Sequence, residues 1–275
     1  MLQAIADALD FEFRHETVLG RDQGSQIGQL GDYLRHKQVL LVLDNFEHLV
    51  EAADCVEQLL AHSTSLKAIV TSRERLNLPA EWTLEIQGLP YPGNQAAEEW
   101  REFGAVRLFL ESARRSQAGF EPGEAAAGDI IRICKLVDGV PLGLELAAAW
   151  VKLLSPREIA AEIAASLDFL GAPRRGVPER HHSLRAVFEH SWRLLAPEEQ
   201  NVFRGLAVFQ SSFTRQAAAQ IAGATLPVLA GLMDKSLLRR RAEDCYELHP
   251  LLKQYAAEQL AASPDEQNRV LERHT

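Results

Sequence analysis

The stretch Val39-Leu40-Leu41-Val42-Leu43-Asp44-Asn45 decides the fold of this chain. Five consecutive aliphatic residues are typical of a strand that is buried on both faces of a parallel sheet. A carboxylate follows the run directly, at the end of the strand where open α/β sheets bind their ligands. In phosphate-handling ATPases an acid at this place holds Mg²⁺. The stretch therefore predicts an α/β domain with Asp44 at its ligand-binding edge.

The segments on either side of this run have the order of an α/β domain. Two short helices are predicted before it, at 2–9 and 25–36, and an amphipathic helix is predicted after it, at 46–61. Further strands are predicted at Lys67–Thr71 and Thr83–Ile86, and this strand–helix–strand spacing indicates a parallel sheet. The glycine-rich phosphate loop G-x-x-x-x-G-K-[ST] occurs nowhere in the 275 residues.

The pattern changes at Gly88-Leu89-Pro90-Tyr91-Pro92-Gly93, a run typical of a domain boundary. Residues 89–172 are predicted as a helical domain, with a capping box at Ser155–Glu158. Residues 180–250 carry three or four helices and two short alternating runs, the pattern of a winged helix, and 251–275 begin a further helical region. The predicted fold class is α/β plus all-α, with a partial parallel sheet in residues 1–88.

The composition is that of a globular protein. A chain of 275 residues with 47% hydrophobic and 24% charged residues can form two or three domains. It contains neither an apolar stretch of membrane-spanning length nor the basic start and apolar core of a signal peptide. Its three cysteines are far apart in the sequence, as expected of free thiols in a reducing compartment. We therefore expect a cytoplasmic protein without a membrane partner.

The charges do not favour direct DNA binding through the winged helix. The net charge of the chain is −9, and residues 180–250 contain nine Lys or Arg and seven Asp or Glu. The candidate recognition helix, Leu226–Asp234, has no basic residue that could reach a phosphate or a guanine edge. Arg239, Arg240 and Arg241 form one basic cluster, which is enough for a phosphate contact but not for specificity. We expect this domain to pack on the α/β domain of residues 1–88 and not to bind DNA.

Five motifs occur in order along nearly the whole chain. They are Leu40–Leu49 (LLVLDNFEHL), Ala68–Leu76 (AIVTSRERL), Asp138–Ala148 (DGVPLGLELAA), Ser183–Phe209 (SLRAVFEHSWRLLAPEEQNVFRGLAVF) and Tyr246–Ala257 (YELHPLLKQYAA). With these motifs the chain resembles part of a signal-transducing P-loop ATPase of the STAND class, lacking the N-terminal P-loop segment. Within that class it is most similar to the NB-ARC-like modules of bacterial transcriptional regulators of the SARP and LuxR types.

The resemblance implies roles for two residues that follow the predicted strands. Asp44 corresponds to the Walker B acid beside Mg²⁺, and the alternative is an acid that caps the next helix. Arg73 corresponds to a sensor arginine that reaches the terminal phosphate, and the alternative is a surface arginine paired with Glu74 or Glu47. Asn45 stands where many related ATPases have a second acid. An amide cannot act as a base. Glu47 could substitute for this acid, and the alternative, which we favour, is a solvated glutamate in the first turn of the next helix.

Two more residues acquire roles from the resemblance. Pro141, in the turn Gly139-Val140-Pro141-Leu142, would pack near the adenine, although a Gly-Pro pair also starts ordinary helices. His249 would contact the β-phosphate of bound ADP, and the alternative is a helix-capping histidine on an exposed wing.

The resemblance implies a switch, in which ADP keeps the domains closed and exchange for ATP, with Mg²⁺, opens them. The chain would be the C-terminal two-thirds of such a module, without the strand that lies between Lys67–Thr71 and Thr83–Ile86 in intact members. We expect a gap, a rearranged pairing or an unpaired edge that is prone to self-association. Expected partners are other domains of the parent regulator, a helical-repeat sensor and a DNA-binding effector. The alternative functions are a phosphate-loop-less interaction scaffold and direct DNA binding.

Overall fold

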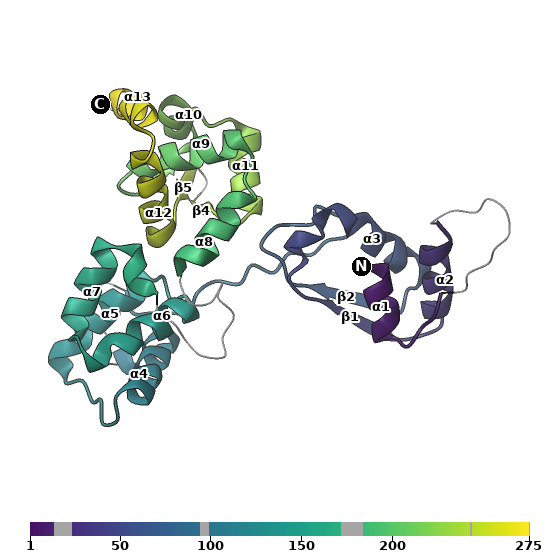
Figure 1. The fold of residues 1–275 in the computed structure, drawn as a ribbon, viewed down its shortest axis with the longest axis horizontal. Helices are drawn as coiled ribbons and strands as arrows, with labels where there is room; N and C mark the ends of the chain where they lie inside the picture. The colour runs from purple at the N-terminus through teal and green to yellow at the C-terminus, as the bar shows by residue number, and fades with distance from the viewer. Residues whose placement is uncertain (14–23, 94–98, 172–183, 243, 275) are drawn as a thin grey trace. The chain divides into compact units, whose positions relative to one another are not determined.

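The computed structural model describes residues 1–13, 24–93, 99–171, 184–242 and 244–274 (Figure 1). The chain divides into two compact units. Unit 1 consists of Met1–Leu84 with Asp234–Ser236, and unit 2 consists of Glu85–Met233 with Leu237–Thr275. The boundary predicted between residues 172 and 180 lies outside the described residues.

Unit 1 is built around a two-stranded parallel sheet, in which Val39 lies opposite Leu66. Three helices accompany the two strands, and α1, α2 and α3 lie on the same side of the sheet (Figure 1). The elements of unit 1 are α1 (Leu2–Ala8), α2 (Gly24–Leu34), β1 (Val39–Leu43), α3 (Ala53–His62) and β2 (Leu66–Val70). The strand predicted at 39–43 and the parallel sheet are therefore confirmed.

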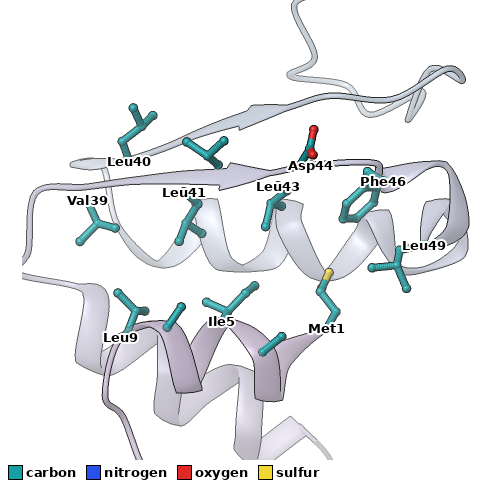
Figure 2. Close-up of a pocket in the computed structure, with 13 residues that line it drawn as sticks. Met1, Ile5, Leu9, Val39, Leu40, Leu41, Leu43, Asp44, Phe46 and Leu49 are labelled. Carbon is teal, nitrogen blue, oxygen red and sulfur yellow. The ribbon is translucent and has the colours of Figure 1, made fainter. Parts of the chain in front are cut away.

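One face of this sheet is buried and the other is exposed. Leu41 points toward α1, opposite Ile5, and belongs to an apolar cluster that also contains residues of α2 and α3 (Figure 2). Leu40, Val42 and Ile69 are 55%, 64% and 54% exposed. The expectation of a strand buried on both faces is therefore wrong for the described residues, because the three helices cover a single face.

The third predicted strand, Thr83–Ile86, does not form. The boundary between the two units falls inside this segment, and no described strand pairs with it. Its apolar side chains remain exposed, with Trp82 at 98%, Leu84 at 87% and Ile86 at 88%. A strand needs a hydrogen-bonded neighbour, and β2 pairs with β1.

The helix predicted at 46–61 begins later than expected. Two 3-10 turns, η1 (Phe46–His48) and η2 (Val50–Ala52), precede α3. At the end of β1, the backbone N–H of Phe46, the first residue of η1, donates to the carbonyl of Thr71, 2.9 Å away. The segment after β1 thus remains bonded to the end of β2 beyond the last paired residues, Leu43 and Val70, before α3 begins.

The first half of unit 2, called here the helical region (residues 85–171), consists of helices, as predicted. Ser155 and Glu158 form the predicted capping box at the start of α7. The elements are η3 (Trp100–Glu102), α4 (Gly104–Ser116), η4 (Glu124–Ala126), α5 (Ala127–Leu136), α6 (Pro141–Ala148), η5 (Ala149–Lys152), α7 (Pro156–Ala165) and η6 (Leu167–Leu170).

The second half of unit 2, called here the C-terminal region (residues 184–233, 237–242 and 244–274), combines helices with a small antiparallel sheet of order β3–β5–β4. The elements are α8 (Leu184–Arg193), α9 (Pro197–Gly205), η8 (Leu206–Val208), β3 (Phe213–Thr214), α10 (Arg215–Ala222), α11 (Leu226–Asp234), β4 (Arg239–Ala242), β5 (Cys245–Glu247), α12 (Pro250–Ala261) and α13 (Pro264–His274).

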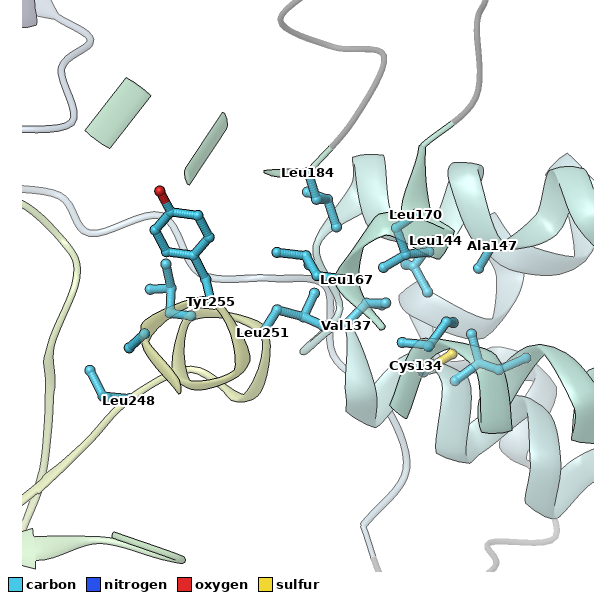
Figure 3. Packing of buried hydrophobic residues seen from close by; sticks show 14 of the residues in the cluster. Cys134, Val137, Leu144, Ala147, Leu167, Leu170, Leu184, Leu248, Leu251 and Tyr255 are labelled. Carbon is cyan, nitrogen blue, oxygen red and sulfur yellow. The ribbon is translucent and has the colours of Figure 1, made fainter. Parts of the chain in front are cut away.

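A single apolar core joins the two regions of unit 2. Val137 and Leu167 from the helical region share a buried cluster with Leu251 and Tyr255 from α12. Leu251 points from α12 toward the helices that carry Val137 and Leu167 (Figure 3).

No single described helix is long and apolar enough to cross a membrane. Helices α10 and α11 reach that length and apolar composition only when taken together, and the chain bends by 106° between them.

Candidate functional site

Asp44 and Thr71 meet at the carboxyl edge of the β1–β2 sheet. Each follows the last residue of its strand, and Leu43 lies opposite Val70 in the parallel register. The hydroxyl of Thr71 donates a hydrogen bond to the carboxylate of Asp44. The backbone N–H of Asn45 in turn donates to the hydroxyl oxygen of Thr71, 3.0 Å away. The structure therefore places Asp44 and Thr71 on one sheet edge, where parallel sheets bind ligands.

The backbone after β1 holds the Asp44 carboxylate outside the next helical turn. Asn45 occupies the N-cap position and has a φ of 56°, in the left-handed region that Asn tolerates better than most residues. Asp44 precedes this position, and its described hydrogen bond comes from Thr71. A cap of the following helix, the alternative role for Asp44, is not the arrangement observed. The carboxylate points away from α1 (Figure 2).

Arg73 and Glu47 form an ion pair beside this edge. Arg73 Nε lies 3.6 Å from Glu47 Oε1, and the Glu47 side chain is only 5% exposed. The Arg73 side chain is 33% exposed. Of the two roles considered for Arg73, the structure shows the pairing with Glu47. The same pair turns the Glu47 carboxylate toward an arginine and away from solvent.

A cavity of about 380 Å³ lies between α1 and β1 (Figure 2). Its walls are mainly apolar side chains, including Ile5, Leu9, Leu41 and Phe46. Such a lining offers few donors to a phosphate, because phosphate binding relies on backbone N–H groups and cationic side chains. Asp44 also lines the cavity, so this apolar space adjoins the carboxyl edge of the sheet.

Pro141 and His249, the two other predicted site residues, lie in unit 2. Pro141 is the exposed first residue of α6. His249 is the N-cap of α12, and its Nδ1 accepts a hydrogen bond of 3.1 Å from the backbone N–H of Leu251. The residue is only 8% exposed. His249 thus has the capping role considered as an alternative, but in a buried position and not on an exposed wing.

Asp138 is a residue that the sequence analysis did not select. It lies in the turn between α5 and α6, and its carboxylate accepts a hydrogen bond of 2.7 Å from the hydroxyl of Tyr91. Arg239, at the start of β4, forms an ion pair with the same carboxylate. His249 Nε2 lies 3.7 Å from Asp138 Oδ2. A signal was present, because a charged residue precedes the Gly-Val-Pro turn inside one of the quoted motifs.

Burial sets the protonation states around Asp138. It lowers the pKa of His249 to about 4, although the negative charge of Asp138 acts in the opposite direction. It also raises the pKa of Tyr91 to about 12, together with the hydrogen bond to Asp138. At neutral pH His249 is therefore uncharged. Because Nδ1 accepts the capping bond, the ring proton is on Nε2, which faces Asp138.

Metal coordination by a dense side-chain cluster finds no support in the part of the chain that the structure describes. No group of three or more His, Cys, Asp or Glu residues there could hold an ion. A Mg²⁺ ion commonly needs less from a protein, since one or two oxygen side chains together with phosphates and water complete its shell. Asp44 with Thr71 is an oxygen pair of that kind.

Comparison with known proteins relates the chain to regulators. Over 252 residues, 87% of the chain, it is 34% identical to "Putative HTH-type transcriptional regulator Rv0890c" of Mycobacterium tuberculosis, of which the match covers 27%. It is 32% identical over 263 residues to "Uncharacterized protein Rv0894" of the same organism, covering 91% of this chain and 64% of that protein. The chain thus resembles proteins named as transcriptional regulators. It spans only part of their length.

Two further comparisons are less informative. No protein-family model matches the chain. Among solved structures, the chain is similar to the STAND protein with a tetratricopeptide repeat sensor PH0952 from Pyrococcus horikoshii. The TM-score is 0.33 at 18% identity, covering 93% of this chain and 32% of the other. At this TM-score the likeness assigns neither a fold nor a residue.

Proposed function

We propose that this chain is a nucleotide-dependent switch module of a transcriptional regulator. Mg²⁺ with ADP or ATP would bind at the carboxyl edge of the β1–β2 sheet. The observation that carries the proposal is the contact between Asp44 and Thr71 at that edge. The names of the mycobacterial relatives supply the regulatory context. Helical-repeat sensor and DNA-binding effector domains of the parent protein are the proposed partners. The C-terminal region would be a winged helix that packs on the nucleotide domain as part of the switch.

The residues present fit the metal side of a nucleotide site. Asp44 and Thr71 would hold Mg²⁺ through hard oxygen atoms, and both side chains are exposed. Bound Mg²⁺ would neutralise charge on the phosphates. Arg73 supplies a guanidinium two residues after Thr71. The 275 residues contain no phosphate loop, so they provide the metal ligands and one cation but not the phosphate cradle.

Hydrolysis by these residues is expected to be slow or absent. Asn45 follows Asp44 and has no proton-accepting carboxylate. Glu47, the other candidate base, is buried in an ion pair with Arg73. A switch needs different affinities of the two nucleotides for two states, and it does not need rapid turnover.

The interaction-scaffold alternative rests on the uncovered face of the sheet. Leu40, Val42 and Ile69 form an exposed apolar surface on adjacent strands, and surfaces of this kind mark interaction sites. Direct DNA binding gains no comparable support. Arg239 pairs with Asp138 and Arg241 pairs with Glu247, so two of the three basic residues of the wing already have acidic partners.

Calorimetric titration with Mg-ADP and Mg-ATP tests the proposal, after the purified protein has been analysed for carried-over nucleotide. We expect Asp44→Asn and Arg73→Ala to weaken binding. Asp54→Asn is the matched control, because Asp54 is an exposed carboxylate on α3 of the same unit. Equal affinities of the Asp44 and Asp54 variants would contradict the assigned site. Absence of both binding and carried-over nucleotide would favour the scaffold.

A further inference from the structure

The helical region and the C-terminal region of unit 2 meet through two kinds of contact. The first is the apolar packing around Val137, Leu167 and Leu251 (Figure 3). The second is polar and converges on the carboxylate of Asp138, which contacts Arg239 and His249 of the C-terminal region. Apolar packing is non-directional, whereas a charged hydrogen bond requires a defined geometry.

We propose that Asp138 is a latch that fastens β4 and the start of α12 to the helical region, and that its contact with Arg239 must break when the two regions separate. This proposal rests on the proposed function, because a switch requires the two regions to separate. It rests on the geometry of one carboxylate that has partners on both sides of the interface. Tyr91 belongs to the helical region, and Arg239 and His249 belong to the C-terminal region.

The backbone around Asp138 is built to present this carboxylate. Asp138 and Gly139 both have positive φ, at 48° and 66°, so the chain makes a left-handed turn directly after α5. The N–H of Leu89 donates to the carbonyl of Gly139, 2.8 Å away. A Cβ atom on Gly139 would lie 2.0 Å from the carbonyl oxygen of Leu89, so the close approach requires glycine there.

The degree of burial distinguishes this latch from the other ionic contact across the interface. The Asp138 side chain is 20% exposed and the Arg239 side chain is 34% exposed. In the pair of Arg185 of α8 with Asp168 of η6, the Arg185 side chain is 24% exposed and the Asp168 side chain is 68% exposed, so the two pairs differ in the exposure of the carboxylate. Exposed ion pairs contribute little because water and salt screen them, whereas loss of one partner from a sheltered pair leaves a charge without compensation.

The Nε2 atom of His249 adds a second observation. It is buried and forms no hydrogen bond of regular geometry within the described residues, although a backbone contact with Val137 of the helical region acts to raise its pKa. Its proton faces the Asp138 carboxylate at 3.7 Å, which is beyond hydrogen-bond distance. The contact across the interface is therefore made mainly by Arg239, and Tyr91, on the same side as Asp138, orients the carboxylate.

Hydrogen exchange of the complete chain, without nucleotide, tests the latch. Asp138→Asn is the first variant, because Asn keeps the size of the side chain and tolerates the left-handed backbone. Arg239→Gln is the second. We expect each variant to speed exchange in β4 and the first turn of α12 by about tenfold, the usual effect of losing a hydrogen bond to a charged group. Exchange in α4 should not change.

Asp168→Asn is the matched control, since it makes the same chemical change at the same interface but at an exposed carboxylate. We expect it to change exchange by less than about twofold. The double variant Asp138→Asn/Arg239→Gln should exchange no faster than the faster of the two single variants, because both changes remove the same contact. Equal effects of the Asp138 and Asp168 variants, or fully multiplicative effects in the double variant, would overturn the latch.

The outcome is independent of the calorimetric test of nucleotide binding. Faster exchange in the Asp138 and Arg239 variants without any nucleotide affinity would establish the latch and reject the nucleotide-dependent switch. Nucleotide binding with unchanged exchange in both variants would support the switch and reject the latch.

Discussion

The hydroxyl of Thr71 donates a hydrogen bond to the carboxylate of Asp44 across the ends of two parallel strands. The same hydroxyl oxygen accepts from the N–H of Asn45, 3.0 Å away. Thr71 therefore both orients the candidate metal ligand and fixes the turn that follows β1. Any ligand that binds Asp44 has to accept this orientation or displace the hydroxyl.

Replacing Thr71 by valine removes the hydroxyl and keeps a β-branched side chain at the strand end. We expect Thr71→Val to lower the stability of unit 1 by about 1 kcal/mol, because both side chains are exposed and the net value of such a bond is modest. Hydrogen exchange of the β1 and β2 amides measures unit 1 separately from unit 2. Thr71→Ser should retain the protection because it keeps the hydroxyl, and a loss in the serine variant as large as in the valine variant would contradict the role of the hydroxyl bond.

Neighbouring leucines on β1 provide a test of the one-sided sheet. Leu41 is 9% exposed and Leu40 is 55% exposed. We expect Leu41→Ala to destabilise unit 1 by about 2–3 kcal/mol, because it leaves a cavity beneath the sheet. The same truncation at Leu40 should cost less than about 0.5 kcal/mol. Amide exchange of β2 again gives the measurement.

A large loss in the Leu40 variant would show that the outer face is covered in solution. Sedimentation at several protein concentrations would then identify self-association as the cause. The expected result for the separate chain is a small effect that does not depend on protein concentration.

Local signals in the sequence predicted much of the fold. The aliphatic run at 39–43 forms β1, and Ser155 and Glu158 form the predicted capping box. These elements follow from the residues within one strand or one helical turn. Thr83–Ile86 failed as a strand because strand formation also requires a partner, and alternating side chains do not supply one. The exposed face of β1 was missed for a similar reason, since an aliphatic run does not reveal which faces are covered.

The candidate site was predictable in part. The run ending at Asp44 placed this acid at the sheet edge, and the position of Thr71 followed from parallel pairing. The contact of Asp138 with Tyr91 and Arg239 was not predictable, because it joins residues that are 47 and 101 positions apart. The sequence Asp138-Gly139 could have indicated the left-handed turn that the structure shows there, but not the partners of the Asp138 carboxylate.

Stability should fall in mildly acidic solution because of His249. Burial lowers its pKa in the folded protein to about 4, from an ordinary value of 6.5. Between these values the unfolded chain binds more protons than the folded protein, so the free energy of unfolding decreases as pH falls. This contribution is intact above pH 6.5, is lost as pH drops toward 4, and amounts to on the order of 3 kcal/mol.

His249→Asn isolates this effect, because asparagine is also a good N-cap but does not titrate. We expect the variant to lack the part of the pH dependence between 6.5 and 4 that is due to His249, while the titration of carboxylates affects both proteins alike. Urea unfolding of unit 2 at several pH values, followed by tryptophan fluorescence, measures the difference. Parallel pH profiles for the two proteins would show that His249 titrates normally and that its ring is hydrated in the folded protein.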